Sequence, residues 1–190
     1  MARPRRYDDA LRTRLLETAA DAIAAHGPGG LSLRDVARGA ETSTSAVYGL
    51  FGSRDALVAA VGHEAFARFA AHLAAVPHTD HPDRDLFELG LAYRAFALAE
   101  PHFYRVMFDV APSTGRGVEE PTFAVLRDAV ERTAPAHPAP GEAAFALWSL
   151  VHGLVSLELA GLAPGSDDER TARFAKTLRE VGPALVGSRA

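Results

Sequence analysis

Apolar residues recur along this chain at the spacing of helices, and they do not alternate with polar residues as they would in half-buried strands. The first stripe consists of Leu11, Leu15, Ala19, Ala22 and Ile23, which predicts a helix over residues 8–26. The run of glycine and proline at 27–30 ends it. No stretch rich in Val, Ile and Thr shows the period of two that a strand requires, so the pattern predicts an all-α fold.

The same periodicity, together with capping residues and prolines, sets the bounds of the other helices. Ser32 with Asp35 and Ser166 with Glu169 have the spacing of capping boxes, and Ser53 is placed to cap another helix. Pro82 suits the first position of a helix. The sequence therefore predicts about nine helices, over residues 8–26, 33–40, 44–51, about 54–75, 83–99, 101–110, 121–133, 142–162 and about 167–182.

Composition narrows the classes of function. The chain has 190 residues, 48% of them hydrophobic, which is enough for a packed core, and it contains no cysteine. Disulfides, thiolate catalysis and cysteine-based zinc sites are therefore excluded. The N-terminal residues are charged and include no apolar segment typical of a secretory signal. We therefore expect a cytoplasmic protein.

Charge is distributed unevenly. Residues 1–14 carry five arginines against two aspartates, a local charge of +3, whereas the whole chain has a formal charge of −4. A basic tip on a mildly acidic body suits contact with a polyanion such as DNA. A solvated tail rich in arginine is the alternative interpretation.

Two short predicted helices, 33–40 and 44–51, are joined by a turn of three to four residues, which is the pattern of a helix-turn-helix. On the second helix, Thr44, Ser45 and Tyr48 share one face, while Ser43, Val47, Leu50 and Phe51 are spaced to turn inward. Hydroxyls on such a face can reach phosphates or base edges in the major groove. Alternatively, Ser43 or Thr44 is only a helix cap and Tyr48 a half-buried aromatic residue.

The segment LSLRDVARGAETSTSAVYGLFGSRDAL, residues 31–57, resembles the DNA-binding domain of TetR/AcrR-family regulators. The matching positions are Ser32, Val36, Ala37, Ala40, Ser43, Val47, Tyr48, Phe51, Ser53 and Leu57. The chain departs from the family pattern where Glu41 replaces a glycine of the turn, where Thr42 replaces an apolar residue, and at Gly49–Leu50. A glycine in such a turn relieves a left-handed backbone conformation, so we expect strain at Glu41.

The resemblance implies which residues contact DNA. Tyr48 and Arg54 would bind phosphate, Ser32 and Arg34 would anchor the first half of the motif, and the N-terminal arginines would follow the backbone or enter a minor groove. The full predicted set is Arg3, Arg5, Arg6, Ser32, Arg34, Ser43, Thr44, Ser45, Tyr48, Gly49 and Arg54.

Residues 143–163 form a run long and apolar enough to be weighed as a membrane span. His152 and Glu158 lie inside it and are costly in hydrocarbon, so burial within protein is the favoured interpretation, and no membrane is expected. Its stripe of small residues, with apolar residues of the last helix, predicts a dimer interface, and the family resemblance implies the same. The predicted set is Ser149, Gly153, Ser156, Ala160, Phe174 and Leu178.

Aromatic side chains are spread over the middle helices, and cavities lined by such side chains between bundle helices are usual ligand sites. The predicted pocket consists of Tyr93, Phe96, Phe103, Tyr104, Met107, Phe108, Phe123, Trp148 and His152. Plain core packing is the alternative. Trp148, His152 and Gly153 also resemble the motif of a TetR C-terminal subgroup named WHG after those residues. We expect no cofactor, and no metal, because the His-Glu-x-x-His and Glu-x-x-His pairs are missing.

These observations predict a homodimeric transcriptional regulator that is not an enzyme. Residues 1–60 would bind a palindromic double-stranded operator, and residues 61–190 would dimerise and sense an unknown small apolar effector. The resemblance implies a repressor in which effector binding changes the spacing of the two DNA-binding heads. Three alternatives stay open: a DNA-binding dimer without an effector, a protein-interaction module that uses the same helices, and a helical-bundle enzyme.

Overall fold

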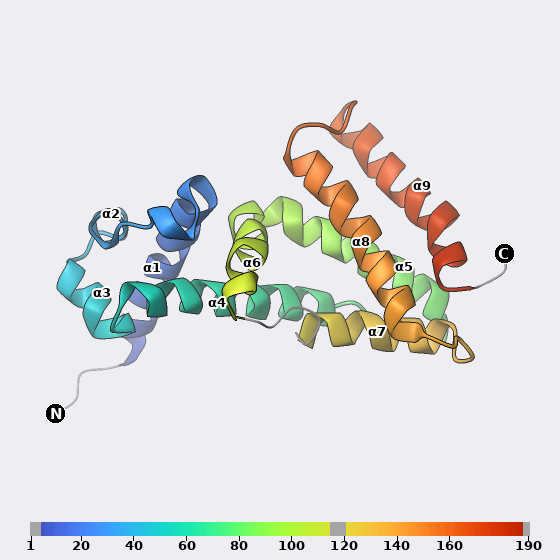
Figure 1. The fold of residues 1–190 in the computed structure, drawn as a ribbon, viewed down its shortest axis with the longest axis horizontal. Coiled ribbons are helices and arrows are strands. Elements are labelled where there is room, and N and C mark those ends of the chain that lie inside the picture. The colour runs from blue at the N-terminus through green and yellow to red at the C-terminus, as the bar shows by residue number, and fades with distance from the viewer. Residues whose placement is uncertain (1–4, 115–120, 188–190) are drawn as a thin grey trace. The chain divides into compact units, whose positions relative to one another are not determined.

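The computed structural model describes residues 5–114 and 121–187, and every regular element within these ranges is helical (Figure 1). The all-α prediction is confirmed. The helices are α1 (Arg5–His26), α2 (Leu33–Gly39), α3 (Thr44–Phe51), α4 (Arg54–Ala74), α5 (Pro82–Ala99), α6 (Pro101–Thr114), α7 (Pro121–Thr133), α8 (Pro140–Leu159) and α9 (Asp167–Leu185), with one 3-10 turn, η1 (Pro28–Gly30).

The chain divides into two compact units. The first contains the residues up to Arg68 together with His102–Gly117, and the second contains Phe69–Pro101 and the residues from Val118 onward. The change from one unit to the other therefore falls inside α4 and at the start of α6, and not in the predicted 76–83 linker. The functional boundary predicted at residue 60 stays a prediction.

The first unit is built on the hydrophobic stripe of α1. Leu15, Leu16, Ala19 and Ile23 are buried, and α1 packs against η1 and α2, while α2 packs against α3. The other buried hydrophobic residues of the helix-turn-helix and of the part of α4 before Arg68 are Leu31, Val36, Ala37, Ala40, Val47, Leu57, Val61 and Ala65. The apolar periodicity of the sequence thus forms the core that holds the two short helices.

Helix α6 belongs to the first unit. The His102 ring contacts the Asp21 carboxylate of α1, and the Arg68 guanidinium of α4 lies 4.2 Å from the centre of the Phe103 ring. Arg68 also pairs with Glu64 at 2.9 Å. The start of α6 is therefore tied to both α1 and α4.

The turn after α2 has the strain that the sequence predicts. The Glu41 N–H donates to the Arg38 carbonyl at 3.2 Å, and the Thr42 N–H donates to the Ala37 carbonyl at 2.9 Å. These two bonds form a Schellman motif, which places Glu41 in the left-handed region with φ of 53°. Glu41 is the one non-glycine residue with positive φ in the described ranges.

Replacing Glu41 with glycine should raise the free energy of unfolding by about 1 kcal/mol, because glycine adopts positive φ without a Cβ clash, which outweighs its greater freedom in the unfolded chain. Urea unfolding measures the change. Glu41→Ala is the control, since it removes the carboxylate and keeps the strained backbone. Equal stabilisation by both variants would show that charge, and not the backbone, causes the effect.

The second unit is a bundle in which α5, α7 and α8 pack against one another and α9 packs on α5 and α8. One part of its core contains Val130, Ala143, Ala144, Leu147 and Val186, with Leu86, Phe123, Leu126 and Leu185 against it. Another contains Phe69, Tyr93 and Phe96, whose rings meet at centroid distances of 5.2 and 5.0 Å. The buried apolar residues of α8 therefore pack against the neighbouring helices of this bundle.

Helix α8 lies two to three residues earlier at both ends than the predicted 142–162 range. Pro140 occupies its first turn, and Gly161, with φ of 72°, ends it. The Gly161 and Leu162 amides donate to the carbonyls of Glu158 and Leu157 in a second Schellman motif. By length and composition, α8 is the one helix in the described ranges that could cross a membrane.

The segment before α5 is anchored by a buried carboxylate. Asp85 accepts hydrogen bonds from the Thr79 hydroxyl and from the Thr79 N–H, both at 2.7 Å, and pairs with the Arg132 guanidinium of α7 at 2.5 Å. The Thr79 hydroxyl and amide, with Arg132, lower the pKa of Asp85 from 3.8 to about 2. The ionised carboxylate therefore joins the linker, α5 and α7.

Asp85 should give part of the stability its pH dependence. Because the folded-state pKa lies below the unfolded value, the contribution of Asp85 is complete above about pH 4 and is lost as pH falls toward 2. Asp85→Asn should therefore unfold more easily than the wild type at pH 6, and the two proteins should converge near pH 2. Urea unfolding across this range is the measurement, with Asp83→Asn, an exposed carboxylate of the same turn, as control. A constant difference would contradict the assignment.

Candidate nucleic-acid interface

Helix α3 presents hydroxyls on its outer face and buries its apolar side. Thr44, Ser45 and Tyr48 are exposed, Tyr48 by 54%, whereas Val47 is 1% exposed and Leu50 is half-buried. The sequence places these residues so because Val47 and Leu50 share the face that meets the core. The outer face is therefore free to approach a partner, as predicted.

Ser43 is spaced with the inward-facing residues, but it caps α3, which is the alternative that the sequence leaves open. Its side chain is exposed, and its hydroxyl accepts a hydrogen bond from the Ala46 N–H at 3.2 Å, which makes it the N-cap of α3. It also lies 2.8 Å from the Ser45 hydroxyl. The physical reason is that the N-cap needs an extended backbone just outside the helix, which directs the serine toward the free amides.

The second turn of α3 presents few polar side chains. Gly49 is exposed, and a Cβ placed there would meet no atom within 4 Å. With Leu50 half-buried, Tyr48 is the polar side chain that this turn offers. The hydroxyls of the first turn therefore carry most of the side-chain hydrogen-bonding capacity of this face.

The first half of the motif uses its predicted capping box only in part. The Ser32 hydroxyl accepts from the Asp35 N–H at 3.4 Å, and the Asp35 carboxylate pairs with Arg38 at 2.6 Å. The guanidinium of Arg38 therefore holds the carboxylate that the predicted box would direct to the Ser32 amide. Arg34 is exposed on α2.

The other predicted DNA contacts divide into two groups. Arg3 and the side chains of Arg5 and Arg6 lie outside the described residues. Arg54 is described, and its guanidinium bonds to the Leu31 carbonyl at 3.1 Å, to the Pro28 carbonyl and to Asp55 at 3.2 Å. It is thus engaged within the first unit.

The predicted ligand residues fall in both units. Phe103, Tyr104, Met107 and Phe108 belong to the first, where the Tyr104 and Phe108 rings meet at 5.1 Å. The second unit contains Tyr93, Phe96, Phe123, Trp148 and His152. Phe123 packs on Trp148 with ring centres 5.9 Å apart. Each set is brought together by the helices of its own unit.

The second set has a polar centre. The Trp148 Nε1–H donates to the Tyr93 hydroxyl at 3.3 Å, and that hydroxyl lies 3.3 Å from Nδ1 of His152. The other ring nitrogen of His152 lies 3.4 Å from the Ser156 hydroxyl. Burial lowers the pKa of His152 from its usual value, which favours the neutral ring. The cluster offers uncharged hydrogen-bonding groups among aromatic rings.

The predicted dimer residues are of two kinds. Ser149 and Ala160 are exposed and Gly153 and Ser156 are half-buried on α8, which leaves a face of small residues with Phe145 and Leu157 exposed beside it. Phe174 and Leu178 are buried within one protomer, at 3% and 8% exposure, and offer little surface to a second copy. The Arg94 guanidinium lies over the Phe174 ring.

The structure contains a buried ion pair that the sequence does not predict. Arg94 of α5 makes two hydrogen bonds to the Glu158 carboxylate of α8, at 2.8 and 2.6 Å, and Arg170 of α9 reaches the same carboxylate at 3.6 Å. The signal was present, because Glu158 is the one acid in the apolar run of residues 143–163. A buried charge needs a partner, but the sequence does not show which one.

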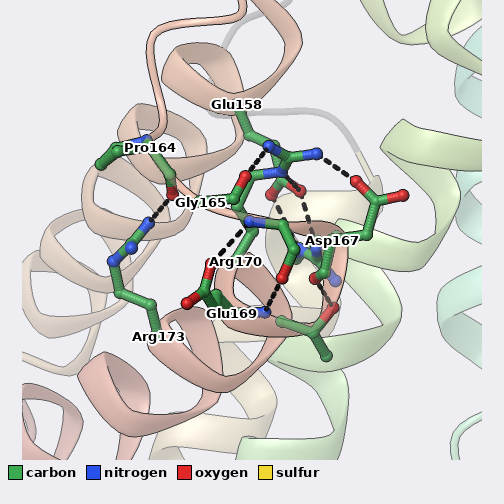
Figure 2. Close-up of polar contacts among 10 residues, drawn as sticks. Glu158, Pro164, Gly165, Asp167, Glu169, Arg170 and Arg173 are labelled. Atoms are coloured by element: carbon green, nitrogen blue, oxygen red, sulfur yellow. Dashed lines mark hydrogen bonds and ion pairs between the residues drawn. The ribbon is translucent and has the colours of Figure 1, made fainter.

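The corner between α8 and α9 is braced by its own side chains (Figure 2). Ser166 and Glu169 complete the predicted capping box, at 3.3 and 2.7 Å. Arg170 donates to the Gly165 carbonyl at 2.5 Å, and Arg173 donates to the Pro164 carbonyl at 2.7 Å. The first turn of α9 is therefore fixed to the loop that precedes it and, through Arg170, to Glu158.

The chemistry available on α3 is hydrogen bonding from a helix held by a hydrophobic core. In the described ranges, no group of three or more His, Asp or Glu side chains is placed to hold a metal ion. Two short helices with an exposed hydroxyl face match the docking geometry of a helix-turn-helix, whose second helix enters the major groove.

Comparison with known proteins supports this assignment. Residues 15–61 match the family described as bacterial regulatory proteins, tetR family, and residues 86–181 match the tetracyclin repressor-like C-terminal domain. No curated protein matches the chain. The WHG subgroup stays a prediction.

Solved structures share this fold over nearly the whole chain. The candidate regulatory protein SCO4313 is 28% identical with a TM-score of 0.71, covering 98% of this chain and 100% of that one. A TetR-family regulator from Marinobacter aquaeolei VT8 is 19% identical with a TM-score of 0.74 over 90% and 95% of the two chains. The fatty acid degradation regulator FadR from Bacillus halodurans is 12% identical with a TM-score of 0.73 over 98% and 97%. The chain belongs to the TetR family of bacterial transcriptional regulators and carries the helix-turn-helix DNA-binding domain of that family.

Proposed function

We propose that this regulator is a cytoplasmic, homodimeric repressor that binds a palindromic operator and releases it when a small apolar effector binds. Residues 1–60 contact DNA, and residues 61–190 dimerise and sense the effector. The observation that carries the DNA-binding part is the exposed hydroxyl face of Thr44, Ser45 and Tyr48 on a helix fixed by buried Val47. Family membership supports the same function.

In vitro selection of bound duplexes with the purified protein tests this proposal. A two-fold symmetric dimer reads two half-sites about 34–36 Å apart, or a multiple of that distance. We therefore expect a palindromic consensus with this spacing. Selection without enrichment would overturn operator binding and would favour a protein-interaction module. A mobility shift at stated salt on upstream and random DNA then separates the two functions.

The proposed dimer uses α8 and α9. The face of Ser149, Gly153, Ser156 and Ala160 permits close approach of a second copy, and exposed Phe145, Leu157 and Val181 supply apolar area beside it. Phe174 and Leu178 are buried within the protomer, where Arg94 of α5 lies over the Phe174 ring and Leu178 lies against Gly90 of α5. Sedimentation analysis should show a dimer, and Gly153→Glu should give monomers if the face is the interface.

The proposed effector site is the aromatic cluster around Tyr93, Trp148 and His152. Its apolar rings suit an apolar body, and its neutral hydrogen-bonding groups suit a polar, uncharged end. A thermal-shift screen of apolar metabolites tests it: a specific stabiliser that also releases the selected operator supports effector control. A regulator whose control depends on abundance or on a protein partner would yield no such compound.

A further inference from the structure

The Arg54 side chain connects two parts of the first unit that lie far apart in sequence. Its Nε–H donates to the Leu31 carbonyl at 3.1 Å, and an Nη–H donates to the Pro28 carbonyl. These acceptors precede Arg54 by 23 and 26 residues. The other Nη pairs with Asp55 at 3.2 Å. The guanidinium is thus bonded on three sides and is 36% exposed.

The two carbonyls lie at the entrance to the helix-turn-helix. Pro28 begins η1, and Leu31 follows η1 immediately before Ser32, the N-cap of α2. Arg54 is the first residue of α4, just beyond the end of α3. The side chain therefore links the start of α4 directly to the segment just before α2. The two ends of the α2–α3 stretch are held together in this way.

The chemistry of this link requires an arginine. A guanidinium presents several N–H donors in a fixed plane, so it can serve two carbonyls at once with defined geometry. A lysine ammonium is a compact, strongly hydrated charge on a flexible stem and does not reproduce that fork.

We propose that Arg54 is a positioning residue for DNA binding, which fixes the orientation of α2 and α3 by holding the Pro28 and Leu31 carbonyls. The inference rests on the proposed DNA-binding function and deepens it. It replaces the direct phosphate contact that the family resemblance implies for Arg54, since each nitrogen of the guanidinium already has a protein acceptor: the Leu31 carbonyl, the Pro28 carbonyl or the Asp55 carboxylate.

Arg54→Lys and Arg54→Ala separate positioning of the helices from direct contact with phosphate. Lysine keeps the positive charge but loses the planar set of N–H donors that serves both carbonyls. Hydrogen exchange of the full-length protein, well below its unfolding temperature, should be at least about tenfold faster over residues 29–36 in both variants and unchanged in α9. Arg38→Lys is the matched control, since Arg38 is an exposed arginine of the same motif whose side chain pairs only with Asp35 among the described contacts. It should exchange like the wild type.

DNA binding gives a second measurement, the salt dependence of affinity, which a general loss of stability would not change. On a random-sequence duplex, the slope of log K against log salt should be unchanged in both variants, whereas loss of a phosphate contact lowers it by about 0.9. On the duplex selected in vitro, Arg54→Lys should bind about tenfold more weakly than wild type despite its charge.

Three results would overturn the proposal: wild-type exchange in Arg54→Lys, wild-type affinity of Arg54→Lys for the selected duplex, or a slope reduced by about 0.9 in Arg54→Ala. Failure of the proposed function has a different signature. In that case no duplex is enriched, while the exchange experiment still decides whether Arg54 holds the two carbonyls.

Discussion

Replacing Glu158 with alanine should lower the free energy of unfolding by about 3 kcal/mol. The carboxylate and the Arg94 side chain are 10% and 12% exposed, and the two hydrogen bonds between them join α8 to α5. Removal of the acid leaves the Arg94 charge buried without the partner that compensates its desolvation, which is the costly way to break a buried pair. Arg170 also loses its contact with α8.

Urea unfolding followed by circular dichroism measures this effect, at matched protein concentration because the proposed dimerisation would make stability depend on concentration. Glu180→Ala is the matched control. Glu180 pairs with Lys176 at 3.8 Å on the surface of α9, where both side chains are more than 60% exposed, so its removal should change stability by less than about 0.5 kcal/mol. A cost below about 1 kcal/mol for Glu158→Ala would show that Arg94 finds water or another acceptor.

Replacing Ser45 with glutamate should weaken binding to the selected operator by about 100-fold or more, because in the proposed complex a carboxylate on the outer face of α3 would meet phosphate, and like charges brought together cost several kcal/mol. The fold should be retained. Ser45 is exposed and lies in the first turn of α3, where a negative charge interacts favourably with the helix dipole. The Ser43 cap is left in place.

Fluorescence anisotropy with the labelled duplex measures the loss, and circular dichroism confirms that the helix content is kept. Ala95→Glu adds the same charge at an exposed position of α5 in the second unit, and it should bind within about threefold of wild type. Equal weakening by both variants would mean that net charge, and not the α3 face, governs binding. Unchanged binding by Ser45→Glu would remove α3 from the interface.

Local signals explain why so much of the helical pattern could be predicted from the sequence. The caps at Ser43, Ser53 and Ser166 lie within three residues of the amides they serve, so their spacing alone identifies the helix starts. The strain at Glu41 follows equally from the residues around one turn. Such features need no knowledge of distant parts of the chain.

The unpredicted features depend on contacts between distant residues. Arg94 and Glu158 are 64 residues apart, and Arg54 reaches carbonyls more than 20 residues earlier. Both arginines are compatible with many partners in the sequence, and only the packing of the helices selects one. For the same reason, Phe174 and Leu178 could be predicted as apolar, but not assigned to the interior of one protomer instead of an interface between two.

The membership of α6 in the first unit matters for protein engineering. An exchange of DNA-binding heads between relatives that cut the chain at residue 60 would divide α4 and omit Val61 and Ala65, which are fully buried. It would also leave Asp21 without His102. A chimera should therefore take residues 1–68 from one parent together with the α6 of that parent, so that the transplanted head keeps its own core although its residues come from two separate stretches of the chain.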